Sequence, residues 1–445
     1  MKLSNSVAFQ RTVRDVISSN HMWEKLRQVW TIKDIRNKIL FVVGMLVIFR
    51  LVAYIPIPGV NLANLRQFLA GNQIFGLMDV FSGGTMSNFS IVMLGVGPYI
   101  TSSIIFQLLA MIVPKLEELS KEGESGQQKI NTYTRLLTVP LAFLQSYGMI
   151  KLLNSSSLPI ITDLSFFRLV TIMMTITAGT MFLMWIGELI SEKKVGNGIS
   201  LLIFAGIAAG LPGALRTVLI NYNSADFYTF VLFAGVAVFT VVGVVFINEG
   251  QRNIPVTYAK QMQGNHMRGG SSTHLPLRVS MAGVIPIIFA ISLILFPSLI
   301  AQFFVQAKTA WIAGVAAGTI RLFQNQLFYG ILYFLLVFGF TYFYTAVIFH
   351  PQKMAENLQK QGGFIPGIRP GTETEKYLGQ TMNRINLTGA SFLGVIAILP
   401  LMLQYFMGTQ SLAIGGASLL IVVSVAIETA KQIDAQITMH AYDTI

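Results

Sequence analysis

The sequence contains no cysteine and few charged residues. Only 11% of its 445 residues are Asp, Glu, Lys or Arg, less than half of the roughly 25% found in soluble domains. The absence of cysteine excludes disulfides, thiolate nucleophiles, iron–sulfur clusters and cysteine-ligated zinc. Hydrophobic residues make up 53% of the chain, and its mean hydropathy is +0.63. Length alone would allow two or three soluble domains, but this composition favours one polytopic membrane domain.

Ten segments are apolar over about the 20 residues that a helix needs to cross the hydrocarbon core of a bilayer. They cover residues 39–56, 91–113, 136–153, 167–186, 198–220, 227–247, 281–303, 327–349, 387–406 and 412–427. We therefore predict an all-α, polytopic membrane protein with ten transmembrane helices.

Acidic residues are absent from all ten segments. Ion-coupled transporters and proton pumps usually need such acids as binding sites or proton relays, so their absence argues against both classes. Arg50 lies near the outer end of the first segment, where its side chain either snorkels to the interface or has a functional role. Gly95-Val96-Gly97 lacks the third glycine of a dinucleotide-binding loop, and the five histidines show no metal-ligand spacing. We expect no enzyme activity, cofactor or metal.

Positive charge is distributed unevenly between the two sides of the membrane. An even number of spans places both termini on one side, and 24 of the 31 Lys and Arg residues fall on that side. They occupy the N-terminal stretch, the loops after spans two, four, six and eight, and the C-terminal tail. Because positive residues stay on the cytoplasmic side, we predict that both termini are cytoplasmic.

Five spans per half is an odd number, so a duplicated half would insert upside down. The loops after spans one and six, 57–90 and 248–280, are both long and lie on opposite sides. We therefore predict two inverted five-helix halves, an arrangement found in many transporters. The predicted halves are residues 38–222 and 223–435, with a cytoplasmic tail at 436–445.

Three further segments carry mixed signals. Residues 61–83 are apolar but interrupted, which fits either a re-entrant segment on the outer side or a surface amphipathic helix. Residues 349–386 place Arg369 among glycines and prolines, which suits either docking to an acidic partner or a solvated loop. The N-terminal extension, 1–37, fits an interfacial helix on the cytoplasmic leaflet or a helix packed on the protein.

Several motifs give the sequence a resemblance to the SecY family, the channel subunits of the bacterial protein-conducting translocon. They are Phe81-Ser82-Gly83-Gly84, Gly97-Pro98-Tyr99-Ile100 with Gln107, Glu122-Gly123-Glu124-Ser125-Gly126, Gly196-Asn197-Gly198-Ile199-Ser200, Tyr258-Ala259-Lys260, Ser272-Thr273-His274-Leu275-Pro276-Leu277, Met281–Pro286, Phe364–Gly371 and Gly415–Ile421. The resemblance runs from about residue 31 to about residue 435, and the order of so many motifs makes it specific.

The resemblance implies a clamshell around an hourglass pore, closed from outside by a plug at residues 61–83. It also implies a ring of aliphatic side chains at the constriction: Val96, Ile100, Ile199, Ile203, Ile288 and Ile421. From the residues alone, each of the six would be ordinary helix packing. An aliphatic ring can shut by dewetting and still yield around a passing chain.

Further roles follow from the same resemblance. A lateral gate between spans two and seven would release transmembrane segments into lipid, and Ser103 and Gln107 would help to close it by hydrogen bonding. Arg252, Lys260 and Arg369, in cytoplasmic loops 248–280 and 350–385, would meet the SecA ATPase or the ribosome. The small subunits SecE and SecG are the implied membrane partners.

The expected function is therefore the pore-forming subunit of the Sec channel, which moves unfolded preproteins bearing signal sequences across the bacterial inner membrane. An inverted-repeat transporter for small solutes is the alternative, and it would need a polar site at the membrane midplane. A membrane-embedded enzyme or scaffold is a second alternative. The chain departs from the family pattern at three places. Gln127 and Gln128 stand where the family commonly has a basic pair, and Asn253 stands where a second basic residue is frequent. Lys193 and Lys194 precede Val195, where a glycine is usual.

Overall fold

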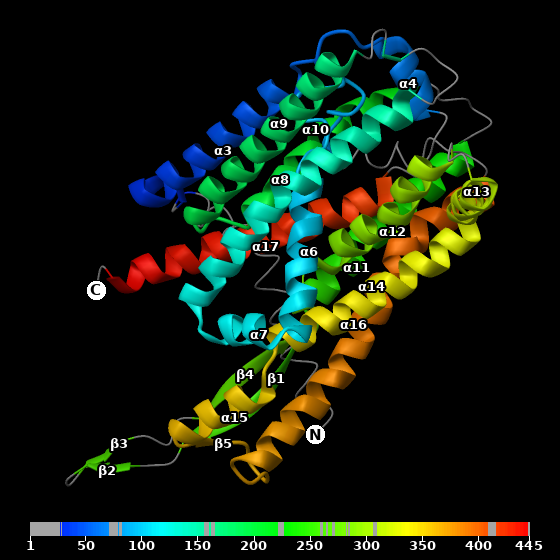
Figure 1. The fold of residues 1–445 in the computed structure, drawn as a ribbon. Coiled ribbons are helices and arrows are strands. Elements are labelled where there is room, and N and C mark those ends of the chain that lie inside the picture. Colours follow the sequence, from blue (N-terminus) through cyan, green and yellow to red (C-terminus); the bar gives the residue numbers. More distant parts are fainter. Residues whose placement is uncertain are drawn as a thin grey trace.

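The computed structural model describes residues 27, 29–70, 79, 82–154, 160–161, 165–220, 227–258, 261–263, 266–268, 272–281, 283, 285–305, 309–407 and 415–443. Long helices form most of the molecule (Figure 1). They are α3 (Lys33–Ala53), α6 (Gly97–Ile112), α8 (Glu124–Asn154), α9 (Phe166–Glu192), α10 (Gly198–Ile220), α11 (Phe227–Glu249), α12 (Ile285–Phe304), α14 (Gln326–Ile348), α16 (Thr372–Met407) and α17 (Gly415–Asp443).

Each predicted span overlaps one of these helices, which confirms the helical fold class. Judged singly within the described residues, four helices are long and apolar enough to cross a membrane, and the bent pair α6–α7 adds a fifth if it counts as one span. The four are Glu124–Asn154, Phe166–Glu192, Gln326–Lys360 and Thr372–Leu399. The total of ten spans therefore stays a prediction.

Shorter elements connect the long helices. The helices are α4 (Leu62–Ala70), α7 (Pro114–Lys121), α13 (Ala310–Gln324) and α15 (Pro351–Lys360). The strands are β1 (Gln251–Tyr258), β2 (Gln261–Gln263), β3 (His266–Arg268), β4 (Ser272–Arg278) and β5 (Gly363–Phe364). In Figure 1, α7, α15 and strands β1 and β4 lie at one end of the molecule, while α4 and α13 lie at the other.

Two predicted spans begin later than expected. The segment 91–113 becomes helical only at Gly97, and the segment 281–303 only at Ile285. In both cases a glycine with positive φ lies two residues before the helix, Gly95 at +57° and Gly283 at +59°. This left-handed conformation breaks the backbone direction, and the proline at the second helical position then starts a new helix.

The two halves pair their helices in the same order. In the first half, α6 packs on α8, α8 on α9 and α9 on α10, while α3 contacts both α9 and α10. In the second half, α12 packs on α14, α14 on α16 and α16 on α17, while α11 contacts both α16 and α17. Corresponding helices are five apart in the order of long helices, so they run in opposite directions. The shared pattern is that of an inverted repeat.

The halves meet through corresponding helices. Contacts between them include the pairs α6–α12 and α10–α17, in which each helix faces its counterpart. This is the contact expected at a pseudo-twofold axis, where a surface meets its own repeat. The main hydrophobic cluster of the molecule draws its residues from these four helices, together with α3, α9, α11, α14 and α16.

The predicted loops 248–280 and 350–385 form one folded unit rather than two separate loops. Strand β1 is antiparallel to β4, with Ile254 opposite Leu275, and antiparallel to β5, with Thr257 opposite Phe364. The strand order is β4-β1-β5. The unit has its own core of buried side chains: Ile254, Val256, Leu277, Phe349, Leu358, Ile365, Leu378 and Met382. Hydrogen bonds and this core join the two loops.

Candidate functional site

All six predicted ring residues lie in one apolar cluster. Val96, Ile100, Ile203 and Ile421 are buried members of it, and Ile421 has no exposed surface. The other two, Ile199 and Ile288, are partly buried and pack against it. The residues come from four separate elements, namely the start of α6, α10, α12 and α17. The structure therefore places all six residues in or against the same apolar cluster, and their role as a ring stays a prediction.

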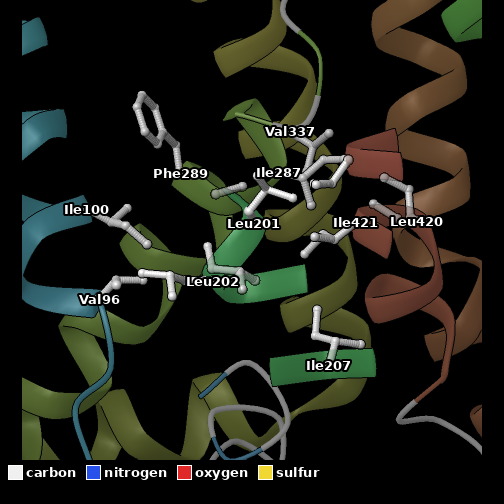
Figure 2. Packing of buried hydrophobic residues seen from close by; sticks show 14 of the residues in the cluster. Val96, Ile100, Leu201, Leu202, Ile207, Ile287, Phe289, Val337, Leu420 and Ile421 are labelled. Carbon is white, nitrogen blue, oxygen red and sulfur yellow. The ribbon is translucent and has the colours of Figure 1, made fainter. Parts of the chain in front are cut away.

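Figure 2 shows how side chains from these helices converge. Val96 and Ile100 extend from α6 toward Leu202 of α10, and Ile421 extends from α17 into the same space. The neighbours Leu201, Ile287 and Leu420 are also aliphatic. Side chains of this kind offer no hydrogen-bond donor or acceptor, so water gains little by entering between them.

A short sequence pattern repeated between the two halves underlies the cluster. Gly95-Val96-Gly97-Pro98-Tyr99-Ile100 and Gly283-Val284-Ile285-Pro286-Ile287-Ile288 share Gly-Val-x-Pro-x-Ile at the starts of α6 and α12. Gly198–Ile203 and Gly416–Ile421 share Gly-x-Ser-Leu-Leu-Ile at the starts of α10 and α17. The last residue of each copy is a predicted ring residue. The halves have thus kept short matching patterns where they meet.

The predicted plug is described only in part. Its first residues form α4, whereas residues 71–78, 80 and 81 lie outside the described part of the chain. Leu65 of α4 is fully buried in a second hydrophobic cluster, which includes Met149 and Ile150 of α8 and Ile172 and Ile176 of α9. The α4 segment is therefore packed onto the helix bundle, unlike a free surface helix.

Arg50 contacts other parts of the protein. One guanidinium nitrogen, Nη1, donates to the carbonyl oxygen of Gly83 at 2.7 Å, and Nη2 donates to the hydroxyl of Tyr54 at 3.3 Å. Arg50 is half-buried, and its guanidinium carbon lies 5.3 Å from the centroid of the Tyr54 ring. The side chain therefore contacts the end of the predicted plug, at Gly83.

The predicted gate residues bond to each other within one helix. The amide nitrogen of Gln107 donates to the hydroxyl of Ser103 at 3.2 Å, one turn apart on α6. The carbonyl oxygen of Gln107 is buried and has no hydrogen-bond partner among the described residues. Helix α6 contacts both α12 and α8, and Ser102 donates to the carbonyl of Thr134 on α8 at 2.7 Å. Among the described residues, Ser103 and Gln107 form no hydrogen bond to another helix, and their role at a gate stays a prediction.

The predicted partner-binding cations lie on the β1–β4–β5 unit. Arg252 is exposed on β1, and Arg369 is exposed in the turn after β5. The backbone carbonyl of Arg369 accepts a hydrogen bond from the Thr374 hydroxyl at 2.9 Å, which fixes this turn at the start of α16. Lys260 lies outside the described residues. Within the described residues, no group of acidic, histidine or cysteine side chains could hold a metal ion.

The fold and the cluster define a polytopic helical membrane protein whose two inverted halves meet at an apolar cluster. The SecY family model matches residues 90–430. The SecY protein translocase subunit of Mycobacterium bovis is 45% identical over 430 residues, which cover 92% of this chain and 96% of that protein. The chain belongs to the SecY family.

Solved structures share the fold. A SecY protein whose plug domain stabilises the closed state of the translocation channel is 17% identical, with a TM-score of 0.60, covering 89% of this chain and 91% of that chain. Sec61 in a canine ribosome–channel complex from the endoplasmic reticulum is also 17% identical, with a TM-score of 0.57 and the same coverage of both chains. At these identities the comparison concerns the fold alone.

Proposed function

We propose that this chain is the central pore-forming subunit of a Sec protein-conducting channel, which moves unfolded preproteins across the membrane. The observation that carries the proposal is the aliphatic cluster at the meeting point of the two halves. It draws Ile100 and Ile288 from one pair of corresponding helices, and Ile203 and Ile421 from the other pair. Opening the clamshell would move α6 away from α12 and α10 away from α17 at the same time. The ring residues of both pairs would therefore separate in one movement.

An aliphatic ring suits a passage for chains of any sequence. It excludes water and ions when closed because a narrow apolar constriction dewets. It offers no fixed binding partner to a passing segment, so it discriminates little among side chains. The residues provide no catalytic group in this scheme; ATP hydrolysis by a motor or translation by the ribosome supplies the work.

The contact between α6 and α12 is the proposed lateral gate, through which a signal sequence or transmembrane segment would reach lipid. The buried, unpartnered carbonyl oxygen of Gln107 supports a modest role for this side chain there, because a passing polar group would satisfy it. Interhelical hydrogen bonds in membranes are worth about 0.6 kcal/mol on average. Ser103 would then act by orienting the Gln107 amide.

The β1–β4–β5 unit is the proposed docking site for SecA or the ribosome, with Arg252, Lys260 and Arg369 as its cations. Basic residues attract the phosphates of ribosomal RNA as well as acidic protein surfaces. The solved canine Sec61 channel stands in a complex with the ribosome. SecE would clamp the two halves, and SecG would be a further small partner.

We place the chain in the bacterial inner membrane with both termini in the cytoplasm. The uneven distribution of Lys and Arg supports this orientation. In Figure 1, the C-terminal end of α17 lies toward the same end of the molecule as α7, and away from α4. The plug would then lie on the outer side and the β1–β4–β5 unit on the cytoplasmic side.

The test is reconstitution in liposomes with SecE and SecG, followed by addition of SecA, ATP and a precursor with a signal sequence. We expect the precursor to become protected from protease only when ATP is present. Ile203→Asn and Ile421→Asn each should raise the resting ion conductance roughly tenfold by wetting the ring. Ile300→Asn is the matched control, since Ile300 is exposed on α12 and lies outside the cluster.

Two results would count against the proposal. One is absence of ATP-dependent protection although the chain is folded and SecA is active with another channel. The other is equal conductance for the ring variants and the Ile300 control. Measured uptake of small solutes by the same liposomes would then favour the transporter alternative.

A further inference from the structure

Gly83, the last residue of the predicted plug, contacts two helices. Its carbonyl oxygen accepts the 2.7 Å hydrogen bond from Arg50 of α3. Its backbone also touches α10, since a Cβ added at Gly83 would lie 2.5 Å from the Cα of Gly206 and 3.2 Å from Nη1 of Arg50. The φ angle of Gly83 is +75°, a conformation that other residues rarely adopt. Both the backbone angle and the close approach therefore require glycine.

The contact with Gly206 places Gly83 directly next to the ring. Ile199, Ile203 and Gly206 follow one another at i, i+4 and i+7, so they share one face of α10. Gly206 is one turn beyond Ile203, on the face that carries the two ring residues. Whatever fixes Gly83 against this face also fixes the end of the plug beside the ring.

The turn around Gly83 is internally braced. The amide of Gly84 donates to the carbonyl of Asp79 at 2.8 Å, and the amide of Ser87 donates to the Asp79 carboxylate at 2.8 Å. The hydroxyl of Ser87 donates to the carbonyl of Gly84 at 3.0 Å. Such a turn moves as a unit, so an attachment at Gly83 restrains the whole segment between the plug and α6.

Arg50 is suited to make a strong attachment. A hydrogen bond from a charged guanidinium is about twice as strong as one between neutral groups. Within the described residues no carboxylate forms an ion pair with Arg50, so the Gly83 carbonyl and Tyr54 are the groups that compensate its charge. Displacing the plug would leave this half-buried cation with a poorer set of partners.

We propose that Arg50 is a positioning residue that latches the C-terminal end of the plug to α3 and so sets how often the resting channel conducts ions. This inference rests on the proposed function of residues 61–83 as a plug. The latch acts on the resting state alone, because translocation requires the plug to leave in any case.

The first measurement is the ion conductance of resting channels in liposomes. Arg50→Gln removes the charge and should raise the conductance several-fold, while ATP-dependent translocation continues. Arg50→Lys keeps a charged donor and should restore most of the seal. Arg321→Gln is the matched control, because it removes one positive charge from an exposed residue of α13; its conductance should equal that of the unaltered chain.

A second measurement follows the turn itself. The chain has no cysteine, so Ser82→Cys introduces a single thiol into this half-buried position. Arg50→Gln should speed its reaction with a membrane-impermeant maleimide several-fold. Gly83→Ala displaces the turn without changing any charge and should do the same. Gly44→Ala on α3 is the control, since a Cβ there meets nothing within 4 Å.

The latch is overturned if Arg50→Gln changes neither conductance nor labelling in a channel that translocates normally. If Arg50→Gln does not accumulate, Arg50→Lys and Gly83→Ala decide the question, and unaltered labelling in both overturns the latch. Failure of the unaltered chain to translocate precursor is a different result, which rejects the proposed function instead.

Discussion

The loop after α3 and the loop after α11 occupy corresponding places in the two halves, yet they fold differently. The first, residues 54–96, contains α4 and packs into a cluster with α8 and α9. The second, residues 250–284, forms β1 to β4 and packs against α15, β5 and the start of α16. The inverted repeat places α4 and the strands β1 and β4 at opposite ends of the molecule (Figure 1).

The difference lies in what each loop packs against. Leu65 of α4 contacts a cluster built from α8 and α9, so the first loop packs against the helix bundle. Leu277 of β4 contacts side chains from α15 and α16, so the second loop forms a separate folded unit. One repeated position thus carries the proposed plug in one half and the proposed docking site in the other.

The largest effects are expected from substitutions that leave a cavity in the hydrophobic core of one loop or the other. Leu65 and Leu277 have no exposed surface, so Leu65→Ala and Leu277→Ala should each cost about 2–5 kcal/mol of local stability. Leu65→Ala should raise the resting ion conductance and leave SecA or ribosome binding unchanged. Leu277→Ala should weaken that binding and leave the conductance unchanged. Conductance and sedimentation binding assays on both variants test the separation.

The comparison would break down if either variant changed both properties to the same extent. Leu144→Ala serves as the control for loss of a leucine side chain, because Leu144 is exposed on α8. It should change neither conductance nor binding.

A second pair of sites tests whether the inverted repeat extends to close packing. Gly179 of α9 faces the segment that leads into α6, and an added Cβ would overlap the carbonyl oxygen of Ile91. Gly389 of α16 faces the segment that leads into α12, and its added Cβ would lie 2.7 Å from the carbonyl oxygen of Val279. We expect Gly179→Ala and Gly389→Ala each to cost about 1–3 kcal/mol, with the larger loss at Gly179.

Thermal denaturation in detergent, monitored by loss of helical signal, measures this prediction. Gly314→Ala on α13 is the control, because its added Cβ meets nothing within 4 Å and alanine favours the helix. A Gly389 variant as stable as this control would show that the close approach is confined to the first half.

Sequence patterns predicted the helices well because long apolar runs admit few other structures in a bilayer. The six ring residues were predicted only through the family resemblance. Residue type and spacing do not distinguish an isoleucine in a pore ring from one in ordinary helix packing. The repeated endings at Ile100 and Ile288, and at Ile203 and Ile421, were visible in the sequence. Their meaning depended on knowing which helices correspond.

The β1–β4–β5 unit and the Arg50 contact could not be predicted in the same way. Strand β5 has two residues, Gly363 and Phe364, and it pairs with a strand more than 100 positions earlier. No local pattern reveals such a pairing. Arg50 donates a hydrogen bond to a backbone carbonyl 33 residues away. Every residue has such a carbonyl, so the sequence does not indicate which one accepts the bond. Helix α13 was missed because it is shorter than a span and amphipathic.

A smaller effect is expected from pH, and only in the loop of the first half. Burial raises the pKa of the Asp79 carboxyl above 3.8, although hydrogen bonds from Ser87 and the charge of Arg66 oppose this shift. When the turn around Gly83 is docked, Asp79 binds a proton more tightly than when the turn is displaced. Docking is therefore stronger when the pH is below the raised pKa, and it weakens as the pH rises through this pKa. Resting conductance should therefore fall as the pH is lowered from neutral toward the raised pKa of Asp79.

Asp79→Asn should remove this pH dependence, since the amide stays neutral throughout. Asp34→Asn is the control: Asp34 is an exposed acid of α3 that pairs with Lys38 at 2.6 Å. It should preserve the fall in conductance. A pH response that persists in Asp79→Asn would assign the titration to another group.

The smallest effect concerns the turn where the second half caps the first. Gln436 of α17 donates to the carbonyl oxygens of Lys193 and Lys194, which follow α9. Lys194 has a φ of +56°, the conformation that favours glycine after a helix, whereas Lys193 has a φ of −75°. Lys194→Gly should therefore stabilise the protein by about 0.5–1 kcal/mol, and Lys193→Gly should destabilise it by a similar amount. Melting temperatures that shift in opposite directions would support this assignment, and equal shifts would contradict it.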